Sequence, residues 1–116
     1  MLYEIRNYNF EPARIDEYRT WAETLALPRL KQEMDIVGFW INNDMEPEYS
    51  GSNPKPDVLG PATVTWIIRW KDRSQRDKVW QALFEDQAWQ DVRAQVPGGR
   101  ESYHRIEMKF CTDILK

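Results

Sequence analysis

Several residue types are scarce in this chain of 116 residues, and each scarcity excludes a kind of protein. Cys111 is the one cysteine, so no disulfide can form within the chain. His104 is the one histidine, which excludes a metal site built from several imidazoles. No apolar run approaches the roughly 20 residues that a helix needs to cross a bilayer. Basic residues number 16 and acidic residues 19, so no excess positive charge is available for nucleic acid or an anionic membrane.

Motifs that bind cofactors are missing as well. Gly98 and Gly99 follow Pro97 as a helix stop ahead of a strand, which is the wrong order for a phosphate-binding loop. Scattered carboxylates have no ligand spacing, and nothing besides His104 marks a haem site. We therefore predict no metal and no cofactor. The lone cysteine, and a first segment without the layout of a signal peptide, lead us to expect a cytoplasmic protein.

Tryptophan is the most distinctive residue that is present. The six are Trp21, Trp40, Trp66, Trp70, Trp80 and Trp89. Indole combines a large apolar surface with one N–H group that needs a hydrogen-bond acceptor. The tryptophans therefore either fill the core and a subunit contact, or line a pocket for a flat or apolar small molecule.

The length of the chain, close to the commonest domain size, predicts a single domain over residues 1–116. Strands are expected at 2–10, 36–41, 62–71 and 100–111. Residues 43–61 contain four prolines and two glycines and are predicted to be a loop. So long a loop is either a lid or interface arm, or a disordered surface insertion.

Two helical regions separate the strands. The first opens at Glu11-Pro12 and is expected to be kinked or divided at Pro28, because proline lacks the N–H of a helix interior. The second follows a cap at Asp72 or Ser74 and continues to Val96 as one helix or two. The resulting order of elements is β-α-β-β-α-β.

That order is the split ferredoxin-like arrangement, an α+β fold in which a four-stranded antiparallel sheet carries its helices on one face. The helices leave the other face of the sheet uncovered. Trp66, Ile68 and Trp70 lie on this uncovered face if Thr63, Thr65 and Ile67 point toward the helices, and the assignment can also be reversed. Either choice leaves apolar side chains on both faces, so the sheet needs a second cover. We expect a homodimer whose two sheets face each other in a dimeric α+β barrel.

Several short motifs follow one another in a distinctive order along most of the chain. The first is Tyr3-Glu4-Ile5-Arg6-Asn7-Tyr8 near the start of the chain, and the last is Asp86-Gln87-Ala88-Trp89, which begins a late helix. Between them lie Trp21, Leu27-Pro28, Val37-Gly38-Phe39-Trp40 and the segment from Trp66 to Trp70. Together these motifs resemble the NIPSNAP family, with its YELRxY start and its DPxW helix entry, although Gln87 replaces the proline. The loop at 43–61, and a last strand without a proline-rich ending, depart from the family.

The resemblance to NIPSNAP proteins implies a dimeric α+β barrel of ferredoxin-like subunits, in agreement with the order of elements. It does not imply an activity, because the family is mostly of unassigned function. The wider barrel superfamily includes cofactor-independent monooxygenases, isomerases, cyclases and haem enzymes, and the fold does not choose among them.

Three polar residues alternate along the first strand and share one of its faces: Glu4, Arg6 and Tyr8. If this face looks into the barrel, Glu4 and Arg6 pair with each other or with neighbours, and Tyr8 points a phenol at the cavity. Such a set can anchor a carboxylate or enolate and move a proton. Otherwise the three residues lie on the solvated face of an edge strand.

His104 shares its strand parity with Ile106 and Met108, and is either a hydrogen-bonded core histidine or a general base in the barrel. Arg69, on a central strand, either binds an anionic substrate or forms a structural ion pair.

Two functions follow from these residues. The first is a small cofactor-independent enzyme, of monooxygenase, isomerase or cyclase type, acting on an aromatic or enolisable molecule. Its candidate catalytic residues are Tyr8, His104 and Arg6, and its candidate substrate-binding residues are Glu4, Arg69, Trp40, Trp66 and Trp70. The second is a non-catalytic protein for small-molecule binding or assembly, with a packed dimer barrel.

Overall fold

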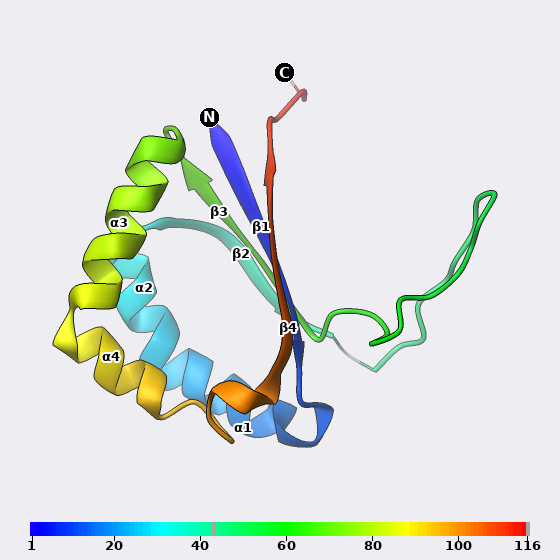
Figure 1. Cartoon of the computed structure of the whole chain (residues 1–116), viewed down its shortest axis with the longest axis horizontal. Coiled ribbons are helices and arrows are strands. Elements are labelled where there is room, and N and C mark those ends of the chain that lie inside the picture. Colours follow the sequence, from blue (N-terminus) through cyan, green and yellow to red (C-terminus); the bar gives the residue numbers. More distant parts are fainter. Residues whose placement is uncertain (43, 116) are drawn as a thin grey trace.

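A computed structural model describes residues 1–42 and 44–115, so Asn43 of the predicted loop lies outside the described chain. The strands are β1 (Leu2–Phe10), β2 (Asp35–Ile41), β3 (Val64–Trp70) and β4 (Tyr103–Cys111). The α-helices are α1 (Ile15–Trp21), α2 (Leu27–Glu33), α3 (Arg73–Glu85) and α4 (Gln87–Ala94). The strands pair antiparallel in the order β2-β3-β1-β4, with the helices along one side of the sheet (Figure 1). This topology confirms the predicted ferredoxin-like α+β fold.

The first helical region accommodates Pro28 without being divided. α1 passes into a π-helical turn over Ala22–Ala26, and α2 begins directly after it at Leu27. In this turn the N–H of Leu27 donates to the carbonyl of Ala22, five residues back. The wider turn relieves the clash that a proline ring makes with the preceding turn of an α-helix. The predicted kink therefore takes the form of a π-helical turn.

The second helical region is two helices. The side chain of Asp72 accepts a hydrogen bond from the N–H of Gln75 at 2.8 Å and caps α3, which confirms one of the two predicted caps. The backbone is extended at Asp86, where the chain turns from α3 into α4. The turn brings Trp80 of α3 and Trp89 of α4 into the buried layer beneath the helices.

Trp66, Ile68 and Trp70 of β3 point toward the helices, the reverse of the assignment considered first, and each is at most 2% exposed. Strand pairing sets Arg6 opposite Trp66 and Glu4 opposite Ile68. The β1 face that carries these charged residues therefore also lies under the helices, so the layer between sheet and helices is not purely apolar.

The opposite face of the sheet is not covered by any described part of the chain. Trp40 is 51% exposed there, and Ile5 and Ile67 are partly exposed beside it. The indole of Trp40 lies against Gly38, where an added Cβ would overlap the ring. This face therefore keeps the apolar surface that the sequence predicted for both sides of the sheet.

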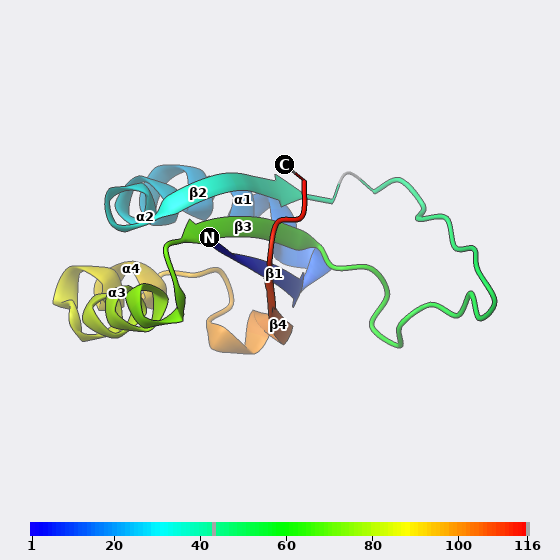
Figure 2. The ribbon, with the colours of Figure 1, turned by 90° about the horizontal axis from the view of Figure 1, so that it is seen from above.

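The segment between β2 and β3 extends away from the sheet and the helices (Figures 1 and 2). Its described residues, 44–61, contain no helix or strand, as their composition predicts. Contacts from two strands hold its end near the sheet: Asn9 of β1 donates to the carbonyls of Leu59, Gly60 and Pro61, and Arg105 of β4 pairs with Asp57 at 2.9 Å.

Candidate functional site

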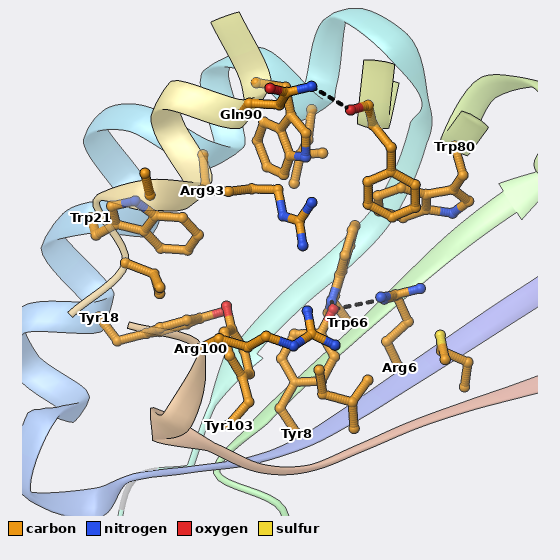
Figure 3. A pocket seen from close by; sticks show the side chains of 18 of the residues that line it. Arg6, Tyr8, Tyr18, Trp21, Trp66, Trp80, Gln90, Arg93, Arg100 and Tyr103 are labelled. Atoms are coloured by element: carbon orange, nitrogen blue, oxygen red, sulfur yellow. Dashed lines mark hydrogen bonds between the residues drawn. The ribbon is translucent and has the colours of Figure 1, made fainter. Parts of the chain in front are cut away.

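A cavity of about 850 Å³ lies between the helix-facing side of the sheet and the helices (Figure 3). This volume is in the usual range of small-molecule sites. The aromatic residues of its wall are Tyr8, Tyr18, Trp21, Phe39, Trp66, Trp80, Phe84, Trp89 and Tyr103. Four of the six tryptophans therefore line a cavity, and none of the described loop residues 44–61 does.

The charged residues of the wall are all arginines: Arg6, Arg76, Arg93 and Arg100. Among the described residues that line the cavity there is no aspartate, glutamate, histidine or lysine. Because the whole chain has a net charge of -3, this local excess of positive charge runs against its overall charge. The cavity therefore suits a ligand that carries or develops negative charge.

Glu4 lies behind the cavity wall, fully buried, and its carboxylate accepts five hydrogen bonds. One oxygen accepts from Arg6 Nη1 at 2.7 Å and Arg76 Nη2 at 2.9 Å. The other accepts from Arg76 Nε at 3.1 Å and from the indoles of Trp70 at 3.0 Å and Trp80 at 3.3 Å. Burial alone would raise the pKa of Glu4, but the hydrogen bonds and charges of Arg76 and Arg6 outweigh it and lower that pKa. Glu4 is an ionised anchor for the two arginines.

Tyr8 presents its hydroxyl at the cavity. The oxygen accepts hydrogen bonds from Arg6 Nε at 2.6 Å and from Trp66 Nε1 at 2.9 Å. These two bonds occupy both lone pairs, so the phenolic proton is left to donate to another group. Burial alone would lower the pKa of Arg6, but Tyr8 and Glu4 outweigh it and raise that pKa, so Arg6 stays charged beside the phenol.

Two further phenols of the wall remain neutral at neutral pH. Burial is the main cause that raises the pKa of Tyr18 and of Tyr103. The Tyr103 ring also packs edge-to-face on Tyr8, with 5.3 Å between centroids. Tyr18 and Tyr103 are therefore suited to packing and hydrogen bonding with a ligand.

His104 lies outside the cavity. Its Nε2 is 2.8 Å from a carboxylate oxygen of Glu11 at the surface, and this contact is the main cause that lowers the pKa of Glu11. An irregularity in the β1–β4 pairing near Asn9 and Phe10 interrupts the alternation of side chains along β4. The prediction that His104 shares a face with the apolar residues of that strand was wrong for this reason.

The other predicted substrate-binding residues divide between two places. Trp66 lines the cavity, whereas Trp70 is buried behind it against Glu4. Arg69 forms a 2.8 Å ion pair with Asp35 on the open face, which is the structural role considered for it. Trp40 is also on the open face, away from the cavity.

Sequence reasoning missed the part of the site that the helices supply. Trp80 and Phe84 are four residues apart on α3, and their rings stack with centroids 5.5 Å apart. Trp89 and Arg93 are four residues apart on α4, and both line the cavity. The i, i+4 spacing of an aromatic residue with a second aromatic or an arginine was the available signal.

Within residues 1–42 and 44–115, no group of three or more histidine, cysteine, aspartate and glutamate side chains is placed to hold a metal ion. None of the helices in this part of the chain is long and apolar enough to cross a membrane.

The fold and the cavity define a ferredoxin-like α+β domain with a pocket between its sheet and its helices. Solved structures of NIPSNAP proteins are similar to it over nearly the whole chain. An uncharacterised NIPSNAP domain protein from Burkholderia xenovorans has a TM-score of 0.74 and 19% identity, covering 99% of this chain and 96% of that one. A NIPSNAP family protein of unknown function from Agrobacterium tumefaciens has a TM-score of 0.74 and 19% identity, covering 96% and 86%. The predicted resemblance to NIPSNAP proteins is confirmed at the level of the fold.

A more distant likeness is to an antibiotic biosynthesis monooxygenase, with a TM-score of 0.57 and 14% identity over 98% of this chain and 99% of that one. No protein-family model and no curated protein matches the sequence. These likenesses show the fold and do not show an activity.

Proposed function

We propose that this chain binds a planar, enolisable or phenolic small molecule in the cavity and acts on it, without a cofactor, by stabilising the negative charge that develops on the ligand oxygen when an α-proton is lost. The observation that carries the proposal is the Tyr8 hydroxyl, whose oxygen is held by Arg6 and Trp66 and whose proton is left to donate. The aromatic walls offer flat apolar surfaces for the rings of such a ligand.

For an enolisable ketone, Tyr8 donates its hydrogen bond to the carbonyl oxygen. As the α C–H bond breaks, its proton passes to water and its electron pair forms the enolate. The negative charge develops on the ligand oxygen that accepts the hydrogen bond of Tyr8. Nε of the charged Arg6 lies 2.6 Å from the phenol oxygen of Tyr8. Reprotonation of the α-carbon from solvent completes the exchange. The monooxygenase of similar fold supports small-molecule chemistry on this scaffold by analogy alone.

A non-catalytic binding protein is the second candidate. It is favoured by the composition of the wall, where the described residues include no carboxylate or imidazole to accept the α-proton. In this case Tyr8 fixes the orientation of the ligand and no proton is removed.

Deuterium exchange separates the two candidates. The α-protons of 2-tetralone would be followed by NMR in D2O with the wild type, Tyr8→Phe and Tyr49→Phe, in which Tyr49 is an exposed phenol of the loop. Catalysis predicts accelerated exchange that falls about 100-fold or more in Tyr8→Phe and is unchanged in Tyr49→Phe. If calorimetry shows that 2-tetralone binds but its exchange is not accelerated, the second candidate is favoured. If neither 2-tetralone nor the phenolic probe 2-naphthol binds, the enzyme and the binding protein are both contradicted.

We also propose that a second copy of the chain covers the open face of the sheet. Trp40, Ile5 and Ile67 offer apolar surface there, and the ion pair of Arg69 with Asp35 lies on the same face. Sedimentation equilibrium should give twice the 13.9 kDa mass of the chain. Trp40→Asp should shift the mass to one chain, whereas Val58→Asp, on the exposed loop, should not. A wild type of 13.9 kDa would contradict the dimer.

A further inference from the structure

We infer that the ligand of the cavity carries a carboxylate, which Arg93 and Arg100 bind together. The inference rests on the proposed function in one respect, that the cavity between sheet and helices is the ligand site. It adds the chemical class of the ligand, a flat aromatic or fused-ring carboxylic acid.

Arg93 and Arg100 differ from most arginines because, among the described residues, they have no carboxylate partner. Seven of the ten arginines form an ion pair with a carboxylate. Arg93 and Arg100 form no ion pair or side-chain hydrogen bond with any residue in the described part of the chain. Figure 3 shows both guanidinium groups directed into the same space, Arg93 from α4 and Arg100 from the segment just before β4.

Both arginines are exposed residues that line the cavity, and local structure positions each of them. The guanidinium carbon of Arg93 lies 5.0 Å from the centroid of the Phe84 ring, a cation–π contact within the cavity wall. Arg100 follows Gly98 and Gly99, which both have φ of +73°. Gly99 combines this φ with a ψ of -170°, a conformation that essentially only glycine adopts. The turn therefore directs the chain so that Arg100 faces the cavity.

Trp89 gives an independent indication of a missing acceptor. Of the four tryptophans that line the cavity, Trp21, Trp66 and Trp80 each donate to an acceptor within the chain. Trp89 is 5% exposed, and its indole N–H has no hydrogen-bond partner among the described residues. A buried N–H group without an acceptor is unfavourable, and Trp89 lines the cavity, so a ligand that places an oxygen at this N–H would relieve that cost.

The chemistry of the site favours a carboxylate over other anions. Each guanidinium presents a planar set of N–H groups that matches the two oxygens of a carboxylate. A phosphate ester also fits guanidinium groups, but its dianion loses more hydration on entering a cavity whose walls are largely aromatic. No acidic residue among the described lining residues opposes the ligand charge.

A series of naphthalene derivatives tests this assignment by isothermal titration calorimetry. The probes are 2-naphthoate, its neutral isostere 2-naphthamide, and 2-naphthyl phosphate. Wild type should bind 2-naphthoate at least about tenfold more tightly than the amide, because charge-assisted hydrogen bonds form with the acid alone. Arg93→Gln and Arg100→Gln should each weaken 2-naphthoate about tenfold and leave the amide within about twofold.

Arg19→Gln is the matched control, because Arg19 is exposed, also forms no ion pair with a described residue and lies outside the cavity wall. It should change neither affinity. Trp89→Phe keeps the aromatic surface but removes the N–H, and should weaken 2-naphthoate by a smaller factor than either arginine variant. Unchanged amide binding shows that each variant is folded.

Equal affinity for acid and amide, or 2-naphthoate affinity that survives both arginine variants, would overturn the carboxylate assignment. Tighter binding of 2-naphthyl phosphate with the same dependence on arginine would also overturn it, in favour of a phosphate ester. The proposed function and the carboxylate assignment can fail independently. If 2-tetralone exchanges its α-protons in a Tyr8-dependent way but 2-naphthoate is not preferred over the amide, the proposed function holds and the arginine pair is rejected. If 2-naphthoate binding depends on the arginines but 2-tetralone does not exchange, the arginine pair holds and the catalytic function is rejected.

Discussion

Glu4→Gln should be among the most destabilising single substitutions in this chain, because two arginines of the cavity wall depend on this buried carboxylate. The amide keeps the shape of the side chain but replaces one acceptor oxygen with an NH2 group. If the remaining oxygen faces Trp70 and Trp80, the NH2 group faces Arg6 and Arg76. The hydrogen bonds that these arginines donate to Glu4, at 2.7 Å and 2.9 Å, are then lost. Losing two charge-assisted hydrogen bonds at about 1.5–3 kcal/mol each gives about 3–6 kcal/mol. Removing one partner of a buried ion pair costs a similar amount, about 3–5 kcal/mol.

Urea unfolding followed by tryptophan fluorescence measures this loss. With a slope of about 2 kcal/mol per M, the midpoint of Glu4→Gln should fall by about 2 M. Glu33→Gln is the control, since Glu33 pairs with Arg29 at the surface and is expected to contribute less than about 1 kcal/mol. In a double-mutant cycle with Arg76→Gln, the combined loss should be smaller than the sum of the two. A midpoint for Glu4→Gln that matches the Glu33→Gln control would refute the account of Glu4 as the anchor of this wall.

Three further predictions concern pH, the turn before β4 and the histidine. The pKa of Glu4 is lower in the folded chain than its ordinary value of 4.5, so its stabilisation is present above about pH 4.5 and is lost as the pH falls through the folded pKa. Urea midpoints of the wild type should therefore fall more steeply below pH 4.5 than those of Glu4→Gln, and parallel curves would contradict this. Gly99→Ala should lower the free energy of unfolding by about 1–3 kcal/mol, although the space around the added methyl is open; an unchanged urea midpoint would contradict the backbone argument. His104→Ala should leave the affinity for 2-naphthoate and the exchange of 2-tetralone within about twofold, because His104 pairs with Glu11 outside the cavity; a larger loss would place the histidine in the reaction.

The first strand was the most informative part of the sequence for the site. Its period of two placed Glu4, Arg6 and Tyr8 on one face, and in the structure Arg6 contacts both of the others. Periodicity shows which residues share a face, but it does not show which face the helices cover. The sequence therefore allowed both orientations of Trp66, and the helix-facing one places it in the cavity wall.

The remaining differences have local causes. The pairing irregularity at β4 moved His104 to the surface, and a change of register of this kind leaves no mark in the alternation of residue types. Arg93 and Arg100 come from a helix and from a turn, and only the packing of α4 against the sheet brings them to one cavity. Their lack of carboxylate partners is visible only in three dimensions.

The claim that the ligand site lies between the sheet and the helices is tested most directly by the indole N–H signals of the six tryptophans. A ¹H–¹⁵N spectrum, assigned with single Trp→Phe variants, would be recorded during titration with 2-naphthoate. If the ligand binds there, the signals of Trp89 and Trp66 will shift with a common saturation, while that of Trp40 on the open face will stay in place. A shift confined to Trp40, or none at all at saturating ligand, would contradict it.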